Sequence, residues 1–246
     1  MFDALAASYD SRFGASPSGR LSRFRLAERV TSAISHSSRV LDVGCGTGED
    51  ALWLARVGHT VHGIDPSSAM VETAAAKAAR AGSSATFARG SIESFGGAGA
   101  SFDVVLSNFG AMNCASLSAW SLIVPNLLRS GGRGVVVLLG AHPLPDVVRT
   151  GRASTLRIRA APVRVGEGST TVEYASVSEV VTALRRTCTI ERVEAVGCLV
   201  PAAGHVRFAR ENPGTLGLLA MIESLVRRAR GFRNWGDHTL FEFRRR

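Results

Sequence analysis

The chain has 246 residues, of which 46% are hydrophobic and 20% are charged, and its formal net charge is +9. This length and this apolar content are sufficient for one large domain with a buried core. No apolar run approaches the ~18 residues of a membrane-spanning helix, and residues 1–3 lack the basic and apolar pattern of a signal peptide. We therefore expect a cytoplasmic location and no membrane as a partner.

The positive charge and the cysteines raise two further possibilities, a nucleic-acid partner and a metal site. Lys77 is the only lysine, and the arginines are spread along the chain without a run of five. The cysteines form no C-x-x-C pair and lie at no zinc-ligand spacing from a histidine. We therefore expect no nucleic-acid partner, no metal, and reduced thiols at Cys45, Cys114, Cys188 and Cys198.

A glycine-rich stretch near the start of the chain predicts a ligand site. Residues 39–43 form an apolar run typical of a buried strand, helix-forming residues follow at 50–56, and glycine occupies every second position from 44 to 48. Glycine permits positive φ and leaves the backbone open to a ligand. The spacing is one residue short of the dinucleotide pattern G-x-G-x-x-G. Asp42 suits an ammonium group better than a phosphate, so we expect a nucleoside that carries an amino acid; an ordinary tight turn is the alternative.

A second carboxylate supports this interpretation. Asp65 follows the apolar run 60–64 and lies 17 residues after Gly48. A carboxylate at the end of this strand can accept hydrogen bonds from both ribose hydroxyls. The alternative is a cap for the alanine-rich helix predicted at 68–81.

The sequence D-x-G-x-G-x-G from Asp42 to Gly48 resembles motif I of the class I S-adenosylmethionine-dependent methyltransferases. The resemblance covers about residues 1–140 and implies S-adenosylmethionine as the cofactor. Ser91 departs from the family, which usually has an acidic residue or Asn at that place. The cofactor-binding residues that the resemblance implies are Tyr9, Asp42, Gly44, Cys45, Gly46, Gly48, Asp65, Pro66, Met70, Ser91, Ile92, Asn108 and Phe109.

Strands and helices alternate through five predicted strands, which is typical of an α/β fold with a doubly wound sheet. The resemblance implies a mostly parallel seven-stranded sheet whose last strand, predicted at 238–243, is antiparallel and lies beside the fifth, predicted at 135–139. We expect a single methyltransferase domain over 1–246. Its parts are an N-terminal helical cover (1–37), a cofactor-binding core (38–140), and substrate-cap insertions with the final strands (141–246).

Several boundaries depend on local signals. A helix is predicted from Ser116 to Arg129, with Pro125 inside it expected to bend or interrupt it. Ser176-Val177-Ser178-Glu179 has the pattern of a capping box at the start of a helix. Helical residues are also predicted from 215 to 230.

The candidate catalytic residues come from the second half of the chain. Methyl transfer from a sulfonium is an in-line displacement, in which the protein aligns the groups and sometimes removes a proton. His142 and His205 are the preferred bases, ahead of His238 and the pair Glu173-Tyr174; a structural or exposed histidine is the alternative for each. The arginines of residues 141–175 could bind an anionic group of the substrate or an acidic carrier protein, or be solvated surface charge.

Three functions remain open. The first is methyl transfer to O, N or C of a small, largely apolar biosynthetic molecule resembling a secondary metabolite. The second is a quinone-pathway C-methyltransferase, favoured by the segment Phe109-Gly110-x-x-Asn113 and by the N-terminal residues. The third is a protein that binds the cofactor without transferring methyl. The lack of N-P-P-Y and of Pro-Cys counts against methylation of nucleic acids.

Overall fold

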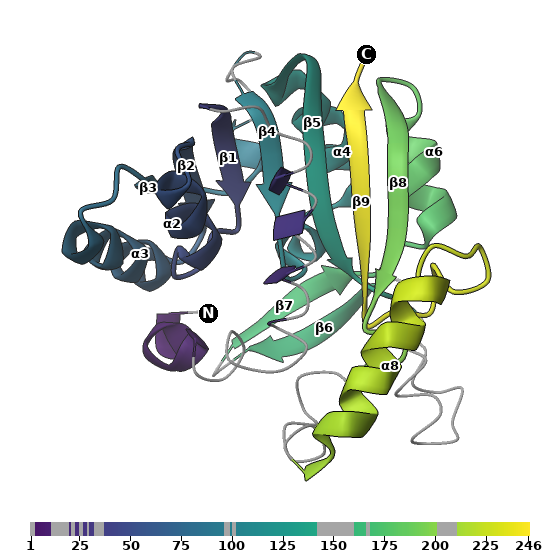
Figure 1. Cartoon of the computed structure of the whole chain (residues 1–246). Coiled ribbons are helices and arrows are strands. Elements are labelled where there is room, and N and C mark those ends of the chain that lie inside the picture. Colours follow the sequence, from purple (N-terminus) through teal and green to yellow (C-terminus); the bar gives the residue numbers. More distant parts are fainter. Residues whose placement is uncertain are drawn as a thin grey trace.

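A computed structural model shows a central sheet of seven strands in the order β3-β2-β1-β4-β5-β9-β8 (Figure 1). The described residues are 3–10, 20, 23, 24, 27, 28, 30, 31, 37–95, 99, 102–141, 160–165, 168–200 and 211–246. The elements are η1 (Asp3–Ser8), β1 (Arg39–Val43), α2 (Glu49–Arg56), β2 (Thr60–Asp65), α3 (Ser68–Ala81), β3 (Thr86–Arg89), η3 (Glu93–Phe95), β4 (Phe102–Ser107), η4 (Ala111–Cys114), α4 (Leu117–Leu127), β5 (Leu128–Leu139), β6 (Ala160–Val165), β7 (Gly168–Glu173), α6 (Val177–Leu184), β8 (Cys188–Val196), α8 (Pro213–Val226) and β9 (His238–Arg245).

The strand directions confirm the predicted fold class. Strands β1 to β5 pair in parallel. Strand β9 lies between β5 and β8 and runs antiparallel to both, so β8 runs in the same direction as the first five. Such a sheet places the ends of β1, β2 and β4 at one edge, where doubly wound folds bind their ligands.

Two apolar layers cover the two faces of the sheet. On one face Trp120 of α4 and Val180 of α6 pack with Phe241 and Phe243 of β9. On the other face α2 and the N-terminal residue Val30 join a cluster that includes the neighbouring strand residue Leu240. The alternation between Leu240 and Phe241 follows the period of two of a strand.

The capping signals are confirmed, but the boundary between α4 and β5 is not as predicted. Ser176 and Glu179 form a complete capping box. Helix α4 continues two residues past Pro125, and β5 begins directly after it, earlier than predicted from the apolar run. Gly132 lies in this early part of β5, where a Cβ would meet the carbonyl oxygens of Arg129 and Asp103 at 2.9 and 3.1 Å.

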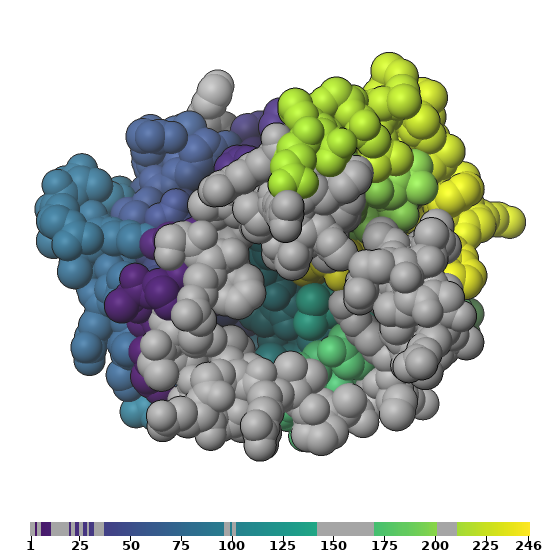
Figure 2. Space-filling model, turned by 90° about the horizontal axis from the view of Figure 1, so that it is seen from below, coloured from purple at the N-terminus to yellow at the C-terminus, as the bar shows by residue number. Residues whose placement is uncertain are grey.

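The insertion after β5 contains a hairpin that the sequence did not predict. Strands β6 and β7 pair antiparallel as a separate two-stranded sheet. In Figure 1 this hairpin lies below the carboxyl ends of β1 and β4. Figure 2, seen from that side, shows a hollow in this face. Among the described residues, no helix has the length and hydropathy to cross a membrane.

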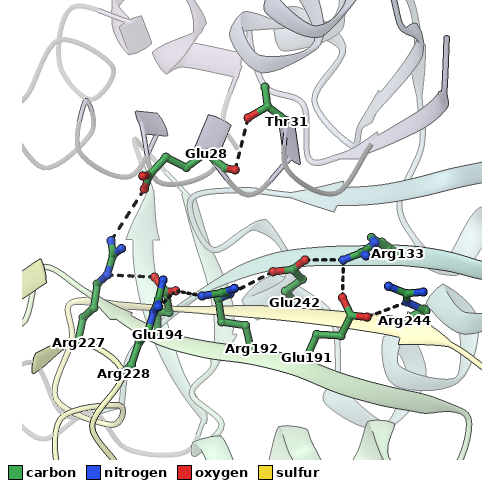
Figure 3. A network of polar contacts seen from close by, with 10 residues as sticks. All are labelled: Glu28, Thr31, Arg133, Glu191, Arg192, Glu194, Arg227, Arg228, Glu242 and Arg244. Carbon is green, nitrogen blue, oxygen red and sulfur yellow. Dashed lines mark hydrogen bonds and ion pairs between the residues drawn. The ribbon is translucent and has the colours of Figure 1, made fainter. Parts of the chain in front are cut away.

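Charged side chains form a network over β5, β9 and β8 (Figure 3). Its most buried carboxylate is Glu194, whose side chain is 1% exposed. Glu194 lies 2.9 Å from Arg228 Nε, 3.3 Å from Arg227 Nε and 3.3 Å from Arg192 Nη1. Glu191, at the more open end of the network, pairs with Arg133 and Arg244. A buried carboxylate among three guanidinium groups is costly to neutralise, because the cations then lose their partner.

We expect Glu194→Gln to lower the free energy of unfolding by about 3 kcal/mol, since it removes the buried carboxylate that pairs with the buried Arg227 and with the more exposed Arg192 and Arg228. Urea unfolding at neutral pH measures this difference. Glu191→Gln, on the same strand but one-quarter exposed, is the control and should cost about 1 kcal/mol or less. Equal losses for the two variants would contradict the special role of Glu194.

Candidate active site

The loop between β1 and α2 has the backbone conformation that its glycines predict. Gly44, Gly46 and Gly48 have φ values of 73°, 52° and 82°, which favour glycine over other residues. The amide groups of Gly44 and Cys45 both donate to the carbonyl oxygen of Ile64, at 2.8 and 3.0 Å. The loop is thereby fixed against the end of β2.

A small cavity of about 30 Å³ lies against this loop at the carboxyl edge of the sheet. Tyr9 and Arg23 of the N-terminal segment are among the residues that line it. A volume of this size holds one or two water molecules, so a larger ligand requires lining side chains to move. Of the predicted cofactor residues, those that line the cavity are Tyr9, Asp42, Gly44, Cys45, Gly46, Asn108 and Phe109.

Asp42 is the most unusual group in this cavity. It is 2% exposed, and its Oδ2 is buried without a hydrogen-bond partner among the described residues. Burial raises the pKa of Asp42 well above its usual value, and Asp50 raises it further, whereas Arg23 opposes the shift. A buried carboxylate oxygen without a donor fits a cationic ligand group.

Asp65 connects the end of β2 to both neighbouring loops. Its Oδ2 accepts from the amide of Gly46 at 3.0 Å, and its Oδ1 accepts from the amide of Ser67 at 2.9 Å. Burial raises the pKa of Asp65, although these two hydrogen bonds act in the opposite direction. Asp65 thus lies beside the glycine loop, whereas the cap of α3 is Ser67, whose hydroxyl accepts from the Met70 amide at 3.2 Å. The ribose-binding role of Asp65 stays a prediction.

Arg23, Asp50 and Thr47 line the cavity but were not predicted. Arg23 Nη1 lies 2.9 Å from Asp50 Oδ1, and its guanidinium stands 5.1 Å from the centre of the Phe109 ring. Asn108 Nδ2 donates to the other oxygen of Asp50 at 3.0 Å. No local pattern marks Arg23, because its contacts are made with residues far away in the sequence.

The N-terminal segment is tied to the core by its acidic residues. Asp3 accepts from the Ser67 hydroxyl at 2.8 Å and from the Ala69 amide at 3.1 Å; these bonds, the Ala69 bond first, lower the pKa of Asp3. Asp10 accepts from the Thr47 hydroxyl and pairs with Lys77, both at 2.5 Å. This docking places Tyr9 beside Gly46, as the predicted cover requires.

The other predicted cofactor residues lie outside the cavity lining. Gly48 caps α2, where a Cβ would meet Ala74 and Phe87 at 2.9 Å. Met70 is fully buried in the first turn of α3, and Ile92 is buried after β3. Pro66 and Ser91 lie in the loops after β2 and β3. Their contacts with the cofactor stay predictions.

Of the residues predicted as bases, only some lie among the described residues. His142 and His205 lie outside the described residues. Glu173 accepts from the Leu117 amide at 3.0 Å and caps α4, and its carbonyl accepts from Asn113 at 2.7 Å. Glu173 and Asn113 therefore hold the structure between β7, η4 and α4, because their polar atoms are used by backbone groups.

His238 has the geometry of a base at this edge. It is the first residue of β9 and pairs with Leu139, the last residue of β5. Its Nδ1 lies 3.1 Å from Asp237 Oδ2, and its ring packs edge-on against Phe109 with 6.2 Å between centres. Among contacts to described residues, Nε2 has no polar partner. Phe109 itself has a φ of 53°, a conformation that residues other than glycine rarely adopt.

The strand order, the glycine loop after β1 and the carboxylate at the end of β2 are features that the class I S-adenosylmethionine-dependent methyltransferases share. Residues 40–132 match the model of a family described as a methyltransferase domain. This part of the chain is therefore similar to a methyltransferase domain, and the similarity supports S-adenosylmethionine as the cofactor.

Known proteins resemble different parts of the chain. A ubiquinone biosynthesis O-methyltransferase from Rhizobium leguminosarum bv. trifolii is 32% identical over 123 residues, which cover 50% of this chain and 46% of that protein. The chain thus spans about half the length of the curated relatives it matches.

Two solved structures resemble nearly the whole chain. An S-adenosylmethionine-dependent methyltransferase from Mesorhizobium loti aligns with a TM-score of 0.58, 19% identity and coverage of 89% of this chain and 96% of that one. The cyclase SpnF aligns with a TM-score of 0.62, 18% identity and coverage of 100% and 93%. At these identities the likeness concerns the fold alone.

We expect Asp42→Asn to stabilise the ligand-free protein at neutral pH by about 1–3 kcal/mol, because it removes a carboxylate whose charged form is disfavoured by burial and by Asp50. Because folding raises the pKa of Asp42, the wild type loses stability relative to this variant as pH rises above the usual pKa of an aspartate, and the difference vanishes below it. Urea unfolding from acid to neutral pH measures the trend. Glu72→Gln, an exposed change on α3, is the control; a difference independent of pH would contradict the assignment.

Proposed function

We propose that this protein is an S-adenosylmethionine-dependent methyltransferase that acts on O, N or C of a small, largely apolar molecule by in-line transfer. The observation that carries the proposal is the unpaired, buried Oδ2 of Asp42 beside the glycine loop. Its cavity also collects Asp50, a guanidinium and two aromatic rings. These groups suit a ligand that carries an ammonium, a carboxylate and a sulfonium better than they suit a phosphate.

Each end of the cofactor has a matching group. Asp42 and Asp50 would hold the ammonium group, Arg23 the carboxylate, and Asp65 the ribose hydroxyls, because each pairs opposite charge or a donor with an acceptor. When bound, S-adenosylmethionine supplies a methyl group on a positively charged sulfur. Tyr9 and Phe109 would exclude water around it, since their rings already line the cavity.

The acceptor has to approach from the open edge of the sheet. Among the described residues, His238 is placed to take a proton there through Nε2 while Asp237 holds Nδ1. The predicted bases His142 and His205 stay candidates of the same kind. The relatives named ubiquinone biosynthesis O-methyltransferases favour a phenolic oxygen as the acceptor. A quinone-pathway C-methyltransferase stays the alternative, as does a cofactor-binding protein without transfer.

Incubation with labelled S-adenosylmethionine and a panel of phenols, quinols and amines tests this proposal. Label in a small-molecule product supports methyl transfer, and the product identifies the atom. Label in no product, despite cofactor binding in the micromolar range, would favour a binding protein.

Asp65→Ala should weaken binding of S-adenosylhomocysteine by roughly ten- to a hundredfold, the loss of charge-assisted hydrogen bonds to a ribose. Isothermal titration calorimetry measures the affinity. Asp103→Ala is the control, because Asp103 lies at the start of β4 and binds the Arg39 amide at the opposite edge of the sheet. Unchanged affinity for Asp65→Ala would refute the ribose role.

His238→Asn should lower kcat with a phenolic acceptor by about a hundredfold or more, the usual contribution of a general base. The affinity for S-adenosylhomocysteine should not change, since the histidine contacts Phe109 rather than the glycine loop. Asp237→Asn should lower kcat less and shift the pH profile. Activity of His238→Asn equal to that of His62→Asn, a change on β2, would show that another group removes the proton.

A further inference from the structure

Helix α8 has an inverted distribution of side chains. Its sequence contains a single charged residue, Glu223, and this residue is 1% exposed. The large apolar side chains face outward instead, with Leu218 52%, Met221 58% and Leu225 78% exposed, together with Ile222. A helix that is apolar on all sides is ordinarily buried. The stripe of Leu218, Met221, Ile222 and Leu225 follows helical spacing, and we name it the α8 stripe.

The contacts of Glu223 explain why the α8 stripe cannot turn inward. One carboxylate oxygen accepts from the Gly197 amide at 3.0 Å, and the other accepts from the amides of Leu199 and Val200 at 2.9 and 3.0 Å. Rotation of the helix would leave this buried charge and these amides without partners, which is costly. The outward position of the stripe is therefore built into the fold.

The end of the helix is fixed as well. The carbonyl of Arg227 accepts from the Ala195 amide at 2.9 Å, and the guanidinium of Arg227 pairs with Glu194 (Figure 3). These contacts hold α8 against β8 at one end, while Figure 1 shows the rest of the helix extending below the carboxyl ends of the strands. The α8 stripe is therefore carried by a helix that is anchored at its C-terminal end.

Basic residues come directly after the α8 stripe in the sequence. Arg230 comes after the last turn and is exposed, and Arg233 is partly exposed. Arg228 pairs with Glu194 through Nε and is still 51% exposed, and Glu211 is the one acidic residue just before the helix. An apolar stripe next to exposed arginines is the arrangement that binds an anionic bilayer surface, with the side chains in the headgroup region and the guanidinium groups on phosphates.

We propose that the α8 stripe docks this protein on the surface of an anionic lipid bilayer. A second copy of the chain is a weaker match, because it brings the same net charge of +9, which opposes association. The expectation of no membrane partner came from the lack of a long apolar run, and a helix that lies in the interface needs none.

Sedimentation of the full chain with vesicles tests the proposal, using phosphatidylcholine alone and phosphatidylcholine mixed with phosphatidylglycerol. We expect binding to the mixed vesicles, and the double variant Leu218→Ser/Leu225→Ser should reduce it at least tenfold. Leu122→Ser is the matched control, since Leu122 is a leucine of α4 with 64% exposure, and it should bind like the wild type. Thermal unfolding should be similar for all three proteins, because the substituted side chains face solvent.

Two results would overturn the proposal. Binding that the double variant retains would show attraction by net charge alone. A wild-type protein that ignores the vesicles but forms a dimer, in light scattering, that the double variant loses would show that the stripe pairs two copies. Neither result depends on methyl transfer, so the outcome is separate from that of the proposed function.

Discussion

The site depends on the hydrogen bonds that fasten the glycine loop to the end of β2. The carbonyl of Ile64 accepts from two successive amides, and the carboxylate of Asp65 accepts from a third. The loop can approach this closely because Gly63 has no side chain; a Cβ there would lie 2.9 Å from Cys45 Sγ. Two neighbouring strands thereby present their carboxylates, Asp42 and Asp65, on either side of one loop. The other residues that line the cavity surround this loop and Asp42.

Gathering like charges in one place has an energetic cost. Asp42 is buried, and both Asp50 and Asp65 act to raise its pKa, while a single guanidinium opposes them. A folded protein tolerates such a site where the rest of the core is well packed, and functional sites commonly carry strain of this kind. A ligand that brings a positive charge relieves the repulsion, so the same groups that weaken the empty protein favour the complex.

Much of the sheet could be predicted from the sequence, because buried parallel strands are apolar runs and the glycine loop has a fixed place after the first of them. Asp65 was identified for the same reason, since its position follows from the end of a strand. Arg23 and Asp50 could not be identified, because their pairing joins residues 27 positions apart in the chain and no spacing encodes it.

Other features differ from their sequence patterns for physical reasons. Glu173 has the polarity of a catalytic group, yet its carboxylate serves the first turn of α4. The residues of α8 read as a core helix by composition, yet one buried glutamate decides which side faces inward. The hairpin of β6 and β7 was missed although β-branched residues flank a Gly-Glu-Gly sequence there, a pattern that favours two strands and a turn; the prolines and arginines of the wider insertion obscured it.

The position of β9 has a consequence for how the chain folds. This strand is synthesised after β8, yet it lies between β5 and β8 and provides the hydrogen bonds of both. While the ribosome is still making it, β5 has an open edge and β8 has no neighbour in the sheet. The nascent chain therefore exposes the unpaired edges of β5 and β8 until β9 emerges, and during that interval it is most vulnerable to aggregation and most dependent on chaperones.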